Sequence, residues 1–390
     1  MKTKILFMIN TMNLGGTEKS LISLLSVMSR DKHDVTILML EKYGELQYFI
    51  PKWVKVEYLN GYSSIKNIIS KPPHKTIIEF LKRGRLIKVL KIFNTYVKYK
   101  ISKNFDCFYF EVLKKHKTIK EYDIAIAYAG PFDFISYFIV KKINAKIKVQ
   151  WIHFDVSKVL SLATFGNKYY QYFDKIFCVS ENAKVVFDDM FPNFCDKTSV
   201  FKNIVSKSNL EKSASIGETF SDGYDGLKIL TLGRLSEEKG QQMVPSIVHR
   251  LKKDKIKFKW YLIGDGKLKD NLLSQIKELD LRNDLIVLGS KINPYRFVKD
   301  CDIYVQTSFH EGYCLTVHEA KILNKPVVIT NVASADNLIL NGEDGLIVEI
   351  NEEAIYTGVK KLITDTKLRM LLSRNLLALE TMSEIKKFNT

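Results

Sequence analysis

The apolar positions of this chain fall into short runs that alternate with segments of helical periodicity. In the first half these runs predict strands over residues 4–9, 35–40, 122–128, 148–152 and 175–179. A helix is expected over 17–28, directly after the first strand. Strands that alternate with helices are typical of a parallel sheet with crossover helices. The first half therefore predicts an open α/β domain.

The same alternation begins again in the second half. The pattern predicts strands and helices in turn over 227–232, 241–252, 259–263, 268–279, 285–288, 294–299, 303–306, 315–323 and 326–330. Residues 206–226 are rich in Ser and Gly with little periodicity, so we expect a linker or loop there. The prediction is two doubly wound α/β domains, 1–205 and 227–365, that face a cleft. A helical tail is expected over 366–390, and it is expected to pack on the first domain.

The composition fits a folded protein of two domains in a reducing compartment. The chain has 390 residues, of which 46% are hydrophobic, so a large core is available. Its five cysteines are scattered without a CxxC motif, which argues against a zinc site or a disulfide scaffold. The chain enters a strand at Lys4 without a signal-peptide pattern, and no uninterrupted apolar run reaches the length of a membrane span. We therefore expect a cytoplasmic protein.

The net charge of +17 is concentrated in one stretch, because residues 62–120 hold 15 Lys and Arg against three acidic residues. Apolar residues alternate with the basic ones at helical spacing: Ile78, Leu81, Leu86, Val89, Leu90, Phe93 and Val97. This pattern predicts a basic amphipathic helix, which suits an anionic membrane surface. A core-packed helix with a solvated basic face fits equally well. Nucleic acid is not expected, because no nucleic-acid-binding signature accompanies the charge.

Two glutamates, Glu311 and Glu319, stand eight residues apart around a loop and the first turns of a helix. Eight helical residues rise about 12 Å and return to nearly the same face. The pair could therefore hold a ligand with a polar sugar at one end and a ribose at the other. The alternative is a surface helix with two solvated carboxylates.

Glycines and cations follow the first strand of each domain. Gly15 and Gly16 would let a ligand approach the backbone, and Thr17 could cap a helix whose amides suit an anion. Alternatively, they form a simple tight turn. In the second domain Arg234 and Lys239 could hold a diphosphate leaving group as it gains charge. Alternatively, both pair with the acidic residues at 237 and 238.

Two further groups of residues bear on metal or proton chemistry. Asp300 and Asp302 form an Asp-x-Asp, a pattern that can hold Mg²⁺ or Mn²⁺ on phosphates. We interpret them instead as the end of a helix and the start of a strand, so no metal is expected. His153 follows a strand of the first domain, where a neutral imidazole could donate to a sugar hydroxyl or accept a proton.

Together these residues resemble a known family. The resemblance rests on Gly15-Gly16, Gly233-Arg234 with Lys239, Gly264-Asp265-Gly266, and Glu311 and Glu319 followed by Lys325-Pro326-Val327-Val328. These motifs are similar to those of the retaining glycosyltransferases of family 4, the group 1 enzymes with the GT-B fold. The resemblance implies two Rossmann-like domains, a nucleotide-diphosphate-sugar donor, no metal or other cofactor, and retention at the anomeric carbon.

The resemblance also assigns roles in the second domain. Arg234 and Lys239 would bind the diphosphate, next to Gly233. Glu311 would contact hydroxyls of the donor sugar, and Glu319 would hold those of the ribose. Two further sets complete the expected donor site, one near the sugar and phosphates (Gly312, Tyr313, Cys314 and Leu315) and one near the base (Ser290, Lys291 and Ile292).

In the first domain, the resemblance places Gly16 at the border of the reaction centre, with Gly15 beside it. His153 would contact the sugar there and would be catalytic together with Glu311, Arg234 and Lys239. Two positions depart from the family pattern and would alter the sugar pocket: Cys314, where a small Gly is frequent, and His318, which precedes the second Glu. The basic stretch lies outside the shared pattern, in a region that family members use for acceptors.

The resulting hypothesis is a hexosyltransferase that uses a UDP- or GDP-sugar. Its acceptor would be a lipid-linked or polysaccharide glycan at the inner face of the cytoplasmic membrane, as in the synthesis of bacterial capsule or O-antigen. Alternatives are another GT-B enzyme, such as a nucleotide-sugar epimerase or a phosphorylase, and a non-catalytic nucleotide-sugar-binding subunit. A phosphorylase would need a pyridoxal-binding lysine, which the sequence does not identify.

Overall fold

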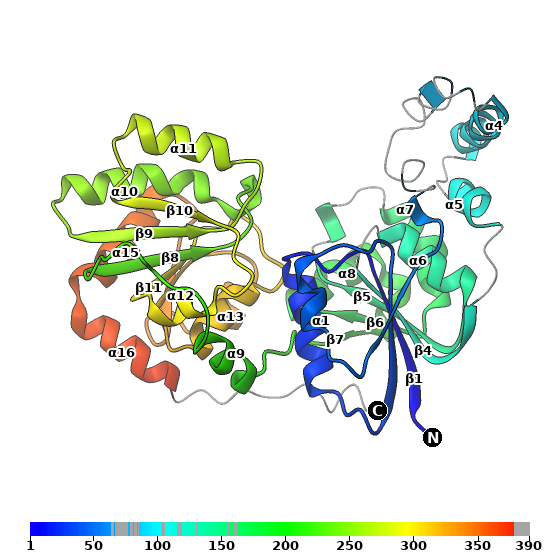
Figure 1. The fold of residues 1–390 in the computed structure, drawn as a ribbon, viewed down its shortest axis with the longest axis horizontal. Helices are drawn as coiled ribbons and strands as arrows, with labels where there is room; N and C mark the ends of the chain where they lie inside the picture. Colours follow the sequence, from blue (N-terminus) through cyan, green and yellow to red (C-terminus); the bar gives the residue numbers. More distant parts are fainter. Residues whose placement is uncertain are drawn as a thin grey trace. The chain divides into compact units, whose positions relative to one another are not determined.

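The computed structural model describes residues 1–63, 86–102, 106–114, 119–129, 132–154, 156–158 and 162–377, together with positions 66, 77, 78, 81 and 84. The chain divides into two compact units, Met1–Lys202 and Asn203–Thr390. Each unit is an α/β layer structure (Figure 1).

The described part of the N-terminal unit contains a seven-stranded parallel sheet of order β3-β2-β1-β4-β5-β6-β7. Its strands are β1 Thr3–Ile9, β2 His33–Met39, β3 Lys55–Tyr58, β4 Ile119–Ala129, β5 Ile143–Ile152, β6 Lys175–Cys178 and β7 Thr198–Val200. Its α-helices are α1 Gly16–Val27, α4 Leu86–Ser102, α5 Asp106–Leu113, α6 Phe132–Lys142, α7 Leu162–Tyr169 and α8 Glu181–Met190.

The sheet of this unit is covered on both faces. Leu6 and Met8 of β1 share a core with the aromatic residues of α6 and α8, while Tyr128 of β4 donates to Ser20 of α1 on the other face. Because both faces are buried, the strands read as continuous apolar runs. The strand order reverses between β1 and β4, and ligands of open α/β sheets bind at the carboxyl edge near such a point.

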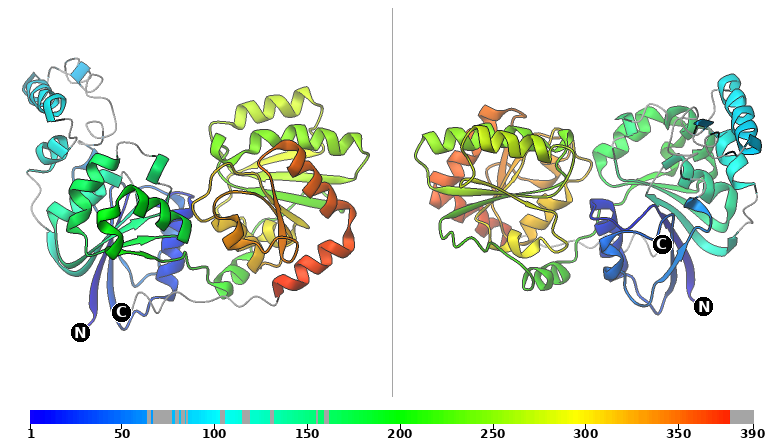
Figure 2. Two further views of the ribbon diagram at one scale, coloured as in Figure 1. Left: turned by 180° about the vertical axis from the view of Figure 1, so that it is seen from behind. Right: turned by 45° about the horizontal axis from the view of Figure 1, so that its top comes forward.

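The described part of the C-terminal unit contains a six-stranded parallel sheet of order β10-β9-β8-β11-β12-β13. Its strands are β8 Leu227–Leu232, β9 Phe258–Ile263, β10 Leu285–Gly289, β11 Ile303–Gln306, β12 Val327–Thr330 and β13 Gly345–Val348. Its helices are α9 Lys207–Ala214, α10 Val244–Lys253, α11 Lys269–Glu278, α12 Tyr295–Asp300, α13 Leu315–Ile322, α14 Ala335–Leu338, α15 Glu352–Thr364 and α16 Thr366–Leu377. Helices α10, α11 and α15 pack on one face, and α9, α12 and α13 on the other (Figure 2). The two doubly wound sheets confirm the predicted fold class.

Residues 206–226 differ from the linker that was expected there, because they contain helix α9. The Ser206 side chain accepts from the backbone N–H of Asn209, and Leu210 and Ala214 are buried in the core of the C-terminal unit. Farther on, Asp222 accepts from Lys259 and Tyr261 of β9. The Ser-rich stretch is thus a capped and anchored part of this unit.

The C-terminal tail is helical in its described part, as predicted, but its packing differs from the expectation. Helix α16 packs within the C-terminal unit, where Leu372 joins the core formed with α10 and α15 and Leu376 is buried. Residues 378–390 lie outside the described residues. The packing of the tail on the first domain therefore finds no support from residues 366–377.

The basic stretch is described mainly at helices α4 and α5. Val89, Tyr96 and Tyr99 of α4 pack in a small cluster with Cys107 of α5. A second row of apolar side chains on α4 is exposed: Leu86, Ile87, Leu90, Phe93, Val97 and Ile101. Lys82, Arg83 and Arg85 lie outside the described residues. Among the residues that are described, no helix is both long and apolar enough to cross a membrane.

Candidate functional site

Glu311 lies at the centre of a hydrogen-bonded cluster at the carboxyl end of β11. Its Oε1 accepts from Lys239 Nζ at 2.7 Å, from Ser308 Oγ at 2.6 Å and from Gln306 Nε2 at 3.2 Å. The side chain of Glu311 is only 8% exposed. The structure therefore excludes a solvated carboxylate at this position. It also pairs Lys239 with Glu311 rather than with the neighbouring glutamates of its own loop.

Gln306 joins this cluster to the strand and the following helix, and the sequence did not point to it. Its amide donates to Ser308 Oγ at 2.8 Å as well as to Glu311. Its carbonyl accepts from Tyr304 Oη at 3.0 Å and from Thr316 Oγ1 at 3.3 Å. A buried amide with all these partners fixes the orientation of Glu311. The signal in the sequence was the polar run Gln-Thr-Ser at the end of an apolar strand.

Lys239 is brought to Glu311 by a tight contact between two loops. Gly240 has φ of 69°, and a Cβ there would lie 1.9 Å from the carbonyl oxygen of Thr307. The Thr307 hydroxyl donates to the carbonyl of Lys239 at 2.8 Å. Only glycine permits this approach. Arg234, the other predicted cation, is exposed in the same loop after β8.

The ammonium of Lys239 keeps its charge at neutral pH. Burial alone would lower the pKa of Lys239, but the negative charges of its surroundings, Glu311 foremost, outweigh burial and raise the pKa above its ordinary value. A fixed cation at the end of β8 is a binding group for phosphate oxygens.

Glu319 lies on α13 and is only 3% exposed. Its Oε1 accepts a hydrogen bond from Tyr295 Oη at 2.8 Å. Tyr295 begins α12, directly after the predicted base-contacting loop, Ser290 to Ile292. In that loop, Lys291 pairs with Glu218. Glu319 is therefore a buried and oriented carboxylate, and the predicted ribose and base positions are neighbours in the structure.

The start of α13 lies between the two glutamates. Gly312 and Tyr313 lead into Cys314, which occupies the N-cap position, and Leu315 is the first helical residue. The Cys314 thiol is buried, and burial raises its pKa, so it stays neutral. The helix thus presents backbone amides beside Glu311, in an arrangement that suits an anion.

In the N-terminal unit, helix α1 begins at Gly16 with Gly15 as its N-cap. Thr17 therefore lies inside the first turn, and the expectation that it caps the helix is wrong. A Cβ at Gly15 would meet the carboxylate of Glu18 at 2.3 Å, so the glycine leaves room for that side chain. Both glycines lie at the carboxyl end of β1, the edge of the sheet where ligands of this fold class bind.

His153 follows β5 at the same edge of this sheet. Its ring stacks on Trp151 at a centroid distance of 6.0 Å and meets the edge of Tyr128 at 4.5 Å. Burial lowers the pKa of His153 to about 3, so the imidazole is neutral at physiological pH. Its Nε2 has no hydrogen-bond partner within the described residues. A neutral ring can therefore donate to, or accept from, a hydroxyl.

Asp300 and Asp302 do not form a joint site. Asp300 accepts from Thr219 Oγ1 at 2.7 Å, whereas Asp302 accepts from the backbone N–H of Lys228 at 2.8 Å. The two carboxylates thus serve separate structural contacts. Across the part of the chain that is described, no group of three or more His, Cys, Asp or Glu side chains could hold a metal ion.

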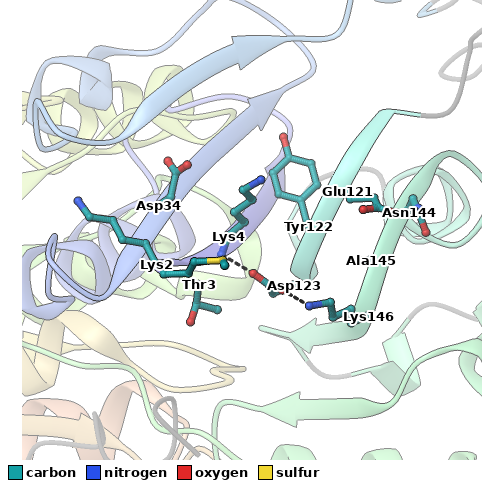
Figure 3. A pocket seen from close by; sticks show the side chains of 11 residues that line it. Lys2, Thr3, Lys4, Asp34, Glu121, Tyr122, Asp123, Asn144, Ala145 and Lys146 are labelled. Carbon is teal, nitrogen blue, oxygen red and sulfur yellow. Dashed lines mark hydrogen bonds and ion pairs between the residues drawn. The ribbon is translucent and has the colours of Figure 1, made fainter.

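A pocket of about 740 Å³ lies at the opposite, amino edge of the N-terminal sheet (Figure 3). Its charges are of both signs, and Asp123 accepts from the backbone N–H of Lys4 at 2.8 Å and from Lys146 Nζ at 2.7 Å. Because ligands of open α/β sheets bind at the carboxyl edge, we do not assign the chemistry to this pocket.

Comparison with known proteins shows that the C-terminal unit is similar to glycosyltransferases. Residues 223–376 match the family model described as "Glycosyl transferases group 1". One relative is N-acetylgalactosamine-N,N'-diacetylbacillosaminyl-diphospho-undecaprenol 4-alpha-N-acetylgalactosaminyltransferase of Campylobacter jejuni. The chain is 32% identical to it over 193 aligned residues, which make up 48% of this chain and 51% of that protein. It is 29% identical, over 154 residues, to the capsular polysaccharide biosynthesis glycosyltransferase CapM of Staphylococcus aureus (39% and 40%). The chain thus spans about half the length of these relatives or less.

Solved structures establish the fold over nearly the whole chain. The complex of Anabaena Alr3699/HepE with UDP and glucose superposes with a TM-score of 0.66 at 17% identity, covering 98% of this chain and 96% of that one. S. aureus TarM superposes with a TM-score of 0.68 at 14% identity, covering 100% and 98%. These neighbours show the two-domain GT-B fold. With the family match, they confirm the predicted resemblance to GT-B glycosyltransferases of group 1.

Proposed function

We propose that the protein is a retaining glycosyltransferase. In this proposal it moves a hexose-type sugar from a UDP- or GDP-sugar to a lipid-linked or polysaccharide acceptor in bacterial surface polysaccharide synthesis. The observation that carries the proposal is the buried pair of Glu311 and Lys239 at the carboxyl end of the C-terminal sheet, with the oriented carboxylate of Glu319 on the next helix. The names of the relatives support a glycan acceptor.

In this proposal each group has its own task in the reaction. As the bond between the anomeric carbon and the phosphate oxygen breaks, the leaving diphosphate gains charge, and Arg234 and Lys239 stabilise it. Glu311 accepts from hydroxyls of the sugar and fixes its orientation. Glu319 accepts from the ribose hydroxyls. His153 is neutral and contacts the sugar near the reacting carbon, next to the backbone of Gly16.

A screen of nucleotide sugars tests the donor proposal. The correct donor should raise the thermal unfolding midpoint, because a ligand that binds only the folded state stabilises it by mass action. Incubation with that donor and candidate acceptors, followed by NMR of the product, then distinguishes transfer with retention from epimerisation. A protein that no UDP- or GDP-sugar stabilises would contradict the proposal, and a product of inverted configuration would contradict retention alone.

We further propose that the reaction needs no metal, because Arg234 and Lys239 supply the positive charge at the diphosphate. Activity is therefore expected to persist in excess EDTA. The measurement is the initial rate of the donor and acceptor pair identified above, with a control in which Mn²⁺ or Mg²⁺ is added back. Loss of activity in EDTA and its recovery with either ion would show that a metal takes part.

We also propose that the basic stretch docks the protein on the anionic inner face of the cytoplasmic membrane, beside a lipid-linked acceptor. The support is the charge of residues 62–120 together with the exposed apolar row on α4. Leu86, Leu90 and Phe93 are 63%, 68% and 55% exposed, at spacings of four and three residues. Such a row can enter the lipid interface while the surrounding cations attract anionic headgroups.

The wild type is expected to sediment with anionic vesicles at low salt and to be released as salt rises. Two variants should reduce vesicle binding, one by removing its electrostatic contribution and one by removing its apolar contribution. Reversal of Lys82, Arg83, Arg85 and Lys88 to Glu removes the attraction, and replacement of Leu86, Leu90 and Phe93 by Ser removes the apolar contact. The change of Lys253, Lys257, Lys267 and Lys277 to Glu is the matched control, since these exposed residues of the C-terminal unit give the same change in charge.

Donor binding should survive in all three variants, because none of the substituted residues is among the proposed donor-binding residues. A wild type that ignores anionic vesicles at low salt would contradict the proposal. An equal loss of binding in the control variant would assign the effect to net charge alone.

A further inference from the structure

Tyr295 is a direct hydrogen-bond partner of the predicted ribose-binding carboxylate. Its hydroxyl donates to Glu319 Oε1 at 2.8 Å, across 24 positions of sequence. Glu319 is almost fully buried, so this contact lies away from bulk water. A hydrogen bond to a buried carboxylate restricts both the position and the rotation of that group.

The start of α12 is itself held in place. The backbone N–H of Tyr295 donates to Asn293 Oδ1 at 3.3 Å. The Asn293 amide donates to the carbonyl oxygen of Ser213 at 2.8 Å and to that of Ile216 at 3.1 Å. Ser213 lies in the last turn of α9, and Ile216 lies just after this helix. Tyr295 therefore presents its hydroxyl from a fixed position rather than from a loop that can turn away.

The phenol stays a donor throughout the working pH range. Burial raises the pKa of Tyr295 well above its ordinary value, and the charge of Glu319 raises it further. The proton therefore remains on the tyrosine oxygen, and the carboxylate remains the acceptor of this bond.

We propose that Tyr295 is a positioning residue that orients Glu319 toward the two ribose hydroxyls and thereby sets the preference for ribonucleotides over deoxyribonucleotides. This inference rests on the proposed function, because it assumes that Glu319 faces the ribose of a nucleotide. Without the Tyr295 hydroxyl, the carboxylate would lose one of the contacts that orient it, and the ribose hydroxyls would meet a less well-placed acceptor.

The test measures the affinities of UDP, 2'-deoxy-UDP, GDP and 2'-deoxy-GDP by titration calorimetry. For the base that the wild type prefers, Tyr295→Phe should weaken binding of the ribonucleotide about tenfold, in line with the loss of one hydrogen bond to a charged group. Binding of the deoxy form should weaken less, about threefold, because it keeps only the 3'-hydroxyl as a partner of Glu319. The preference for ribose should therefore fall about threefold, a change that a general loosening of the pocket would not produce.

Four further variants sharpen the result. Tyr356→Phe is the matched control, because it removes a tyrosine–carboxylate hydrogen bond on α15 and should leave both affinities unchanged. Glu319→Gln should reduce the same preference, and adding Tyr295→Phe to it should cause little further loss, since both act through one contact. Tyr295→His should restore part of the preference by returning a donor.

Equal losses for the ribo and deoxy forms in Tyr295→Phe would overturn the inference and leave Tyr295 a structural residue. Full additivity with Glu319→Gln would also overturn it. A wild type that binds UDP tightly but shows no preference over the deoxy form would overturn the inference while the proposed function stands. Binding of neither UDP nor GDP would instead contradict the proposed function, and the inference with it.

Discussion

Replacing Lys239 or Arg234 by alanine is expected to lower the rate of sugar transfer by about 10²-fold or more. Each cation would stabilise the charge that develops on the leaving diphosphate, and the loss of one such group commonly has an effect of that size. The measurement is kcat with the donor from the nucleotide-sugar screen. The loss should appear in kcat more than in KM, because the contact strengthens as the bond to the sugar breaks.

Lys239→Ala has a second consequence that must be separated from the first. The variant leaves the buried carboxylate of Glu311 without the cation that lies 2.7 Å from it. Some loss of stability is therefore expected. Thermal unfolding of each variant shows whether enough protein is folded at the assay temperature. Arg234→Ala carries no such cost, because Arg234 is exposed.

Lys252→Ala is the matched control, because this lysine pairs with Asp280 and Asp284 on the surface of the C-terminal unit. Surface pairs of this kind contribute little to stability. Its rate should equal that of the wild type. Near-normal rates in both Arg234→Ala and Lys239→Ala would remove the assignment of these residues to the diphosphate.

The fold could be predicted because buried parallel strands leave a plain pattern. Strands such as Leu227–Leu232 and Ile303–Gln306 are covered on both faces, so they read as uninterrupted apolar runs between helices. The carboxyl ends of these strands then indicated where polar residues would gather. The position after the first strand of the second domain indicated Lys239, whereas the spacing of eight residues from Glu319 indicated Glu311.

The contacts that orient these residues could not be predicted in the same way. Gln306 looked like the end of a strand, and its four partners come together only when β11 and α13 have packed. The hydrogen bond from Tyr295 to Glu319 joins helices α12 and α13, which are separated in sequence by strand β11. Helix α9 was hidden because its cap, Ser206, lies in a stretch whose Ser and Gly content is typical of a loop.

The protonation state of His153 also could not be predicted from the sequence. The sequence placed this residue after a strand, but it did not show whether the imidazole is charged. Burial among Trp151 and Tyr128 holds the pKa of the imidazole near 3, so its contact with a sugar would be that of a neutral hydrogen-bonding group. This burial depends on residues of β4 and β5, two strands that only the folded sheet brings together.

The glutamine variants of the two glutamates are expected to differ in kind. Glu311→Gln should lower kcat by about 10²-fold with a small change in KM, because its contacts orient the sugar while charge develops. Glu319→Gln should mainly raise the Kd of the donor, because the ribose is bound equally in the ground state and the transition state. Glutamine keeps the size of each side chain, so both variants should fold.

The two carboxylates have different hydrogen-bond partners, and the two variants are therefore expected to affect different constants. Glu311 accepts from a cation, an amide and a hydroxyl, whereas Glu319 accepts from the phenol of Tyr295. Donor affinity is measured by calorimetry and kcat at saturating donor, so that the two effects cannot be confused. Glu353→Gln, on the exposed face of α15 where Glu353 pairs with Arg250, is the matched control and should change neither value. Indistinguishable profiles for Glu311→Gln and Glu319→Gln would mean that the two residues do not hold opposite ends of one nucleotide sugar.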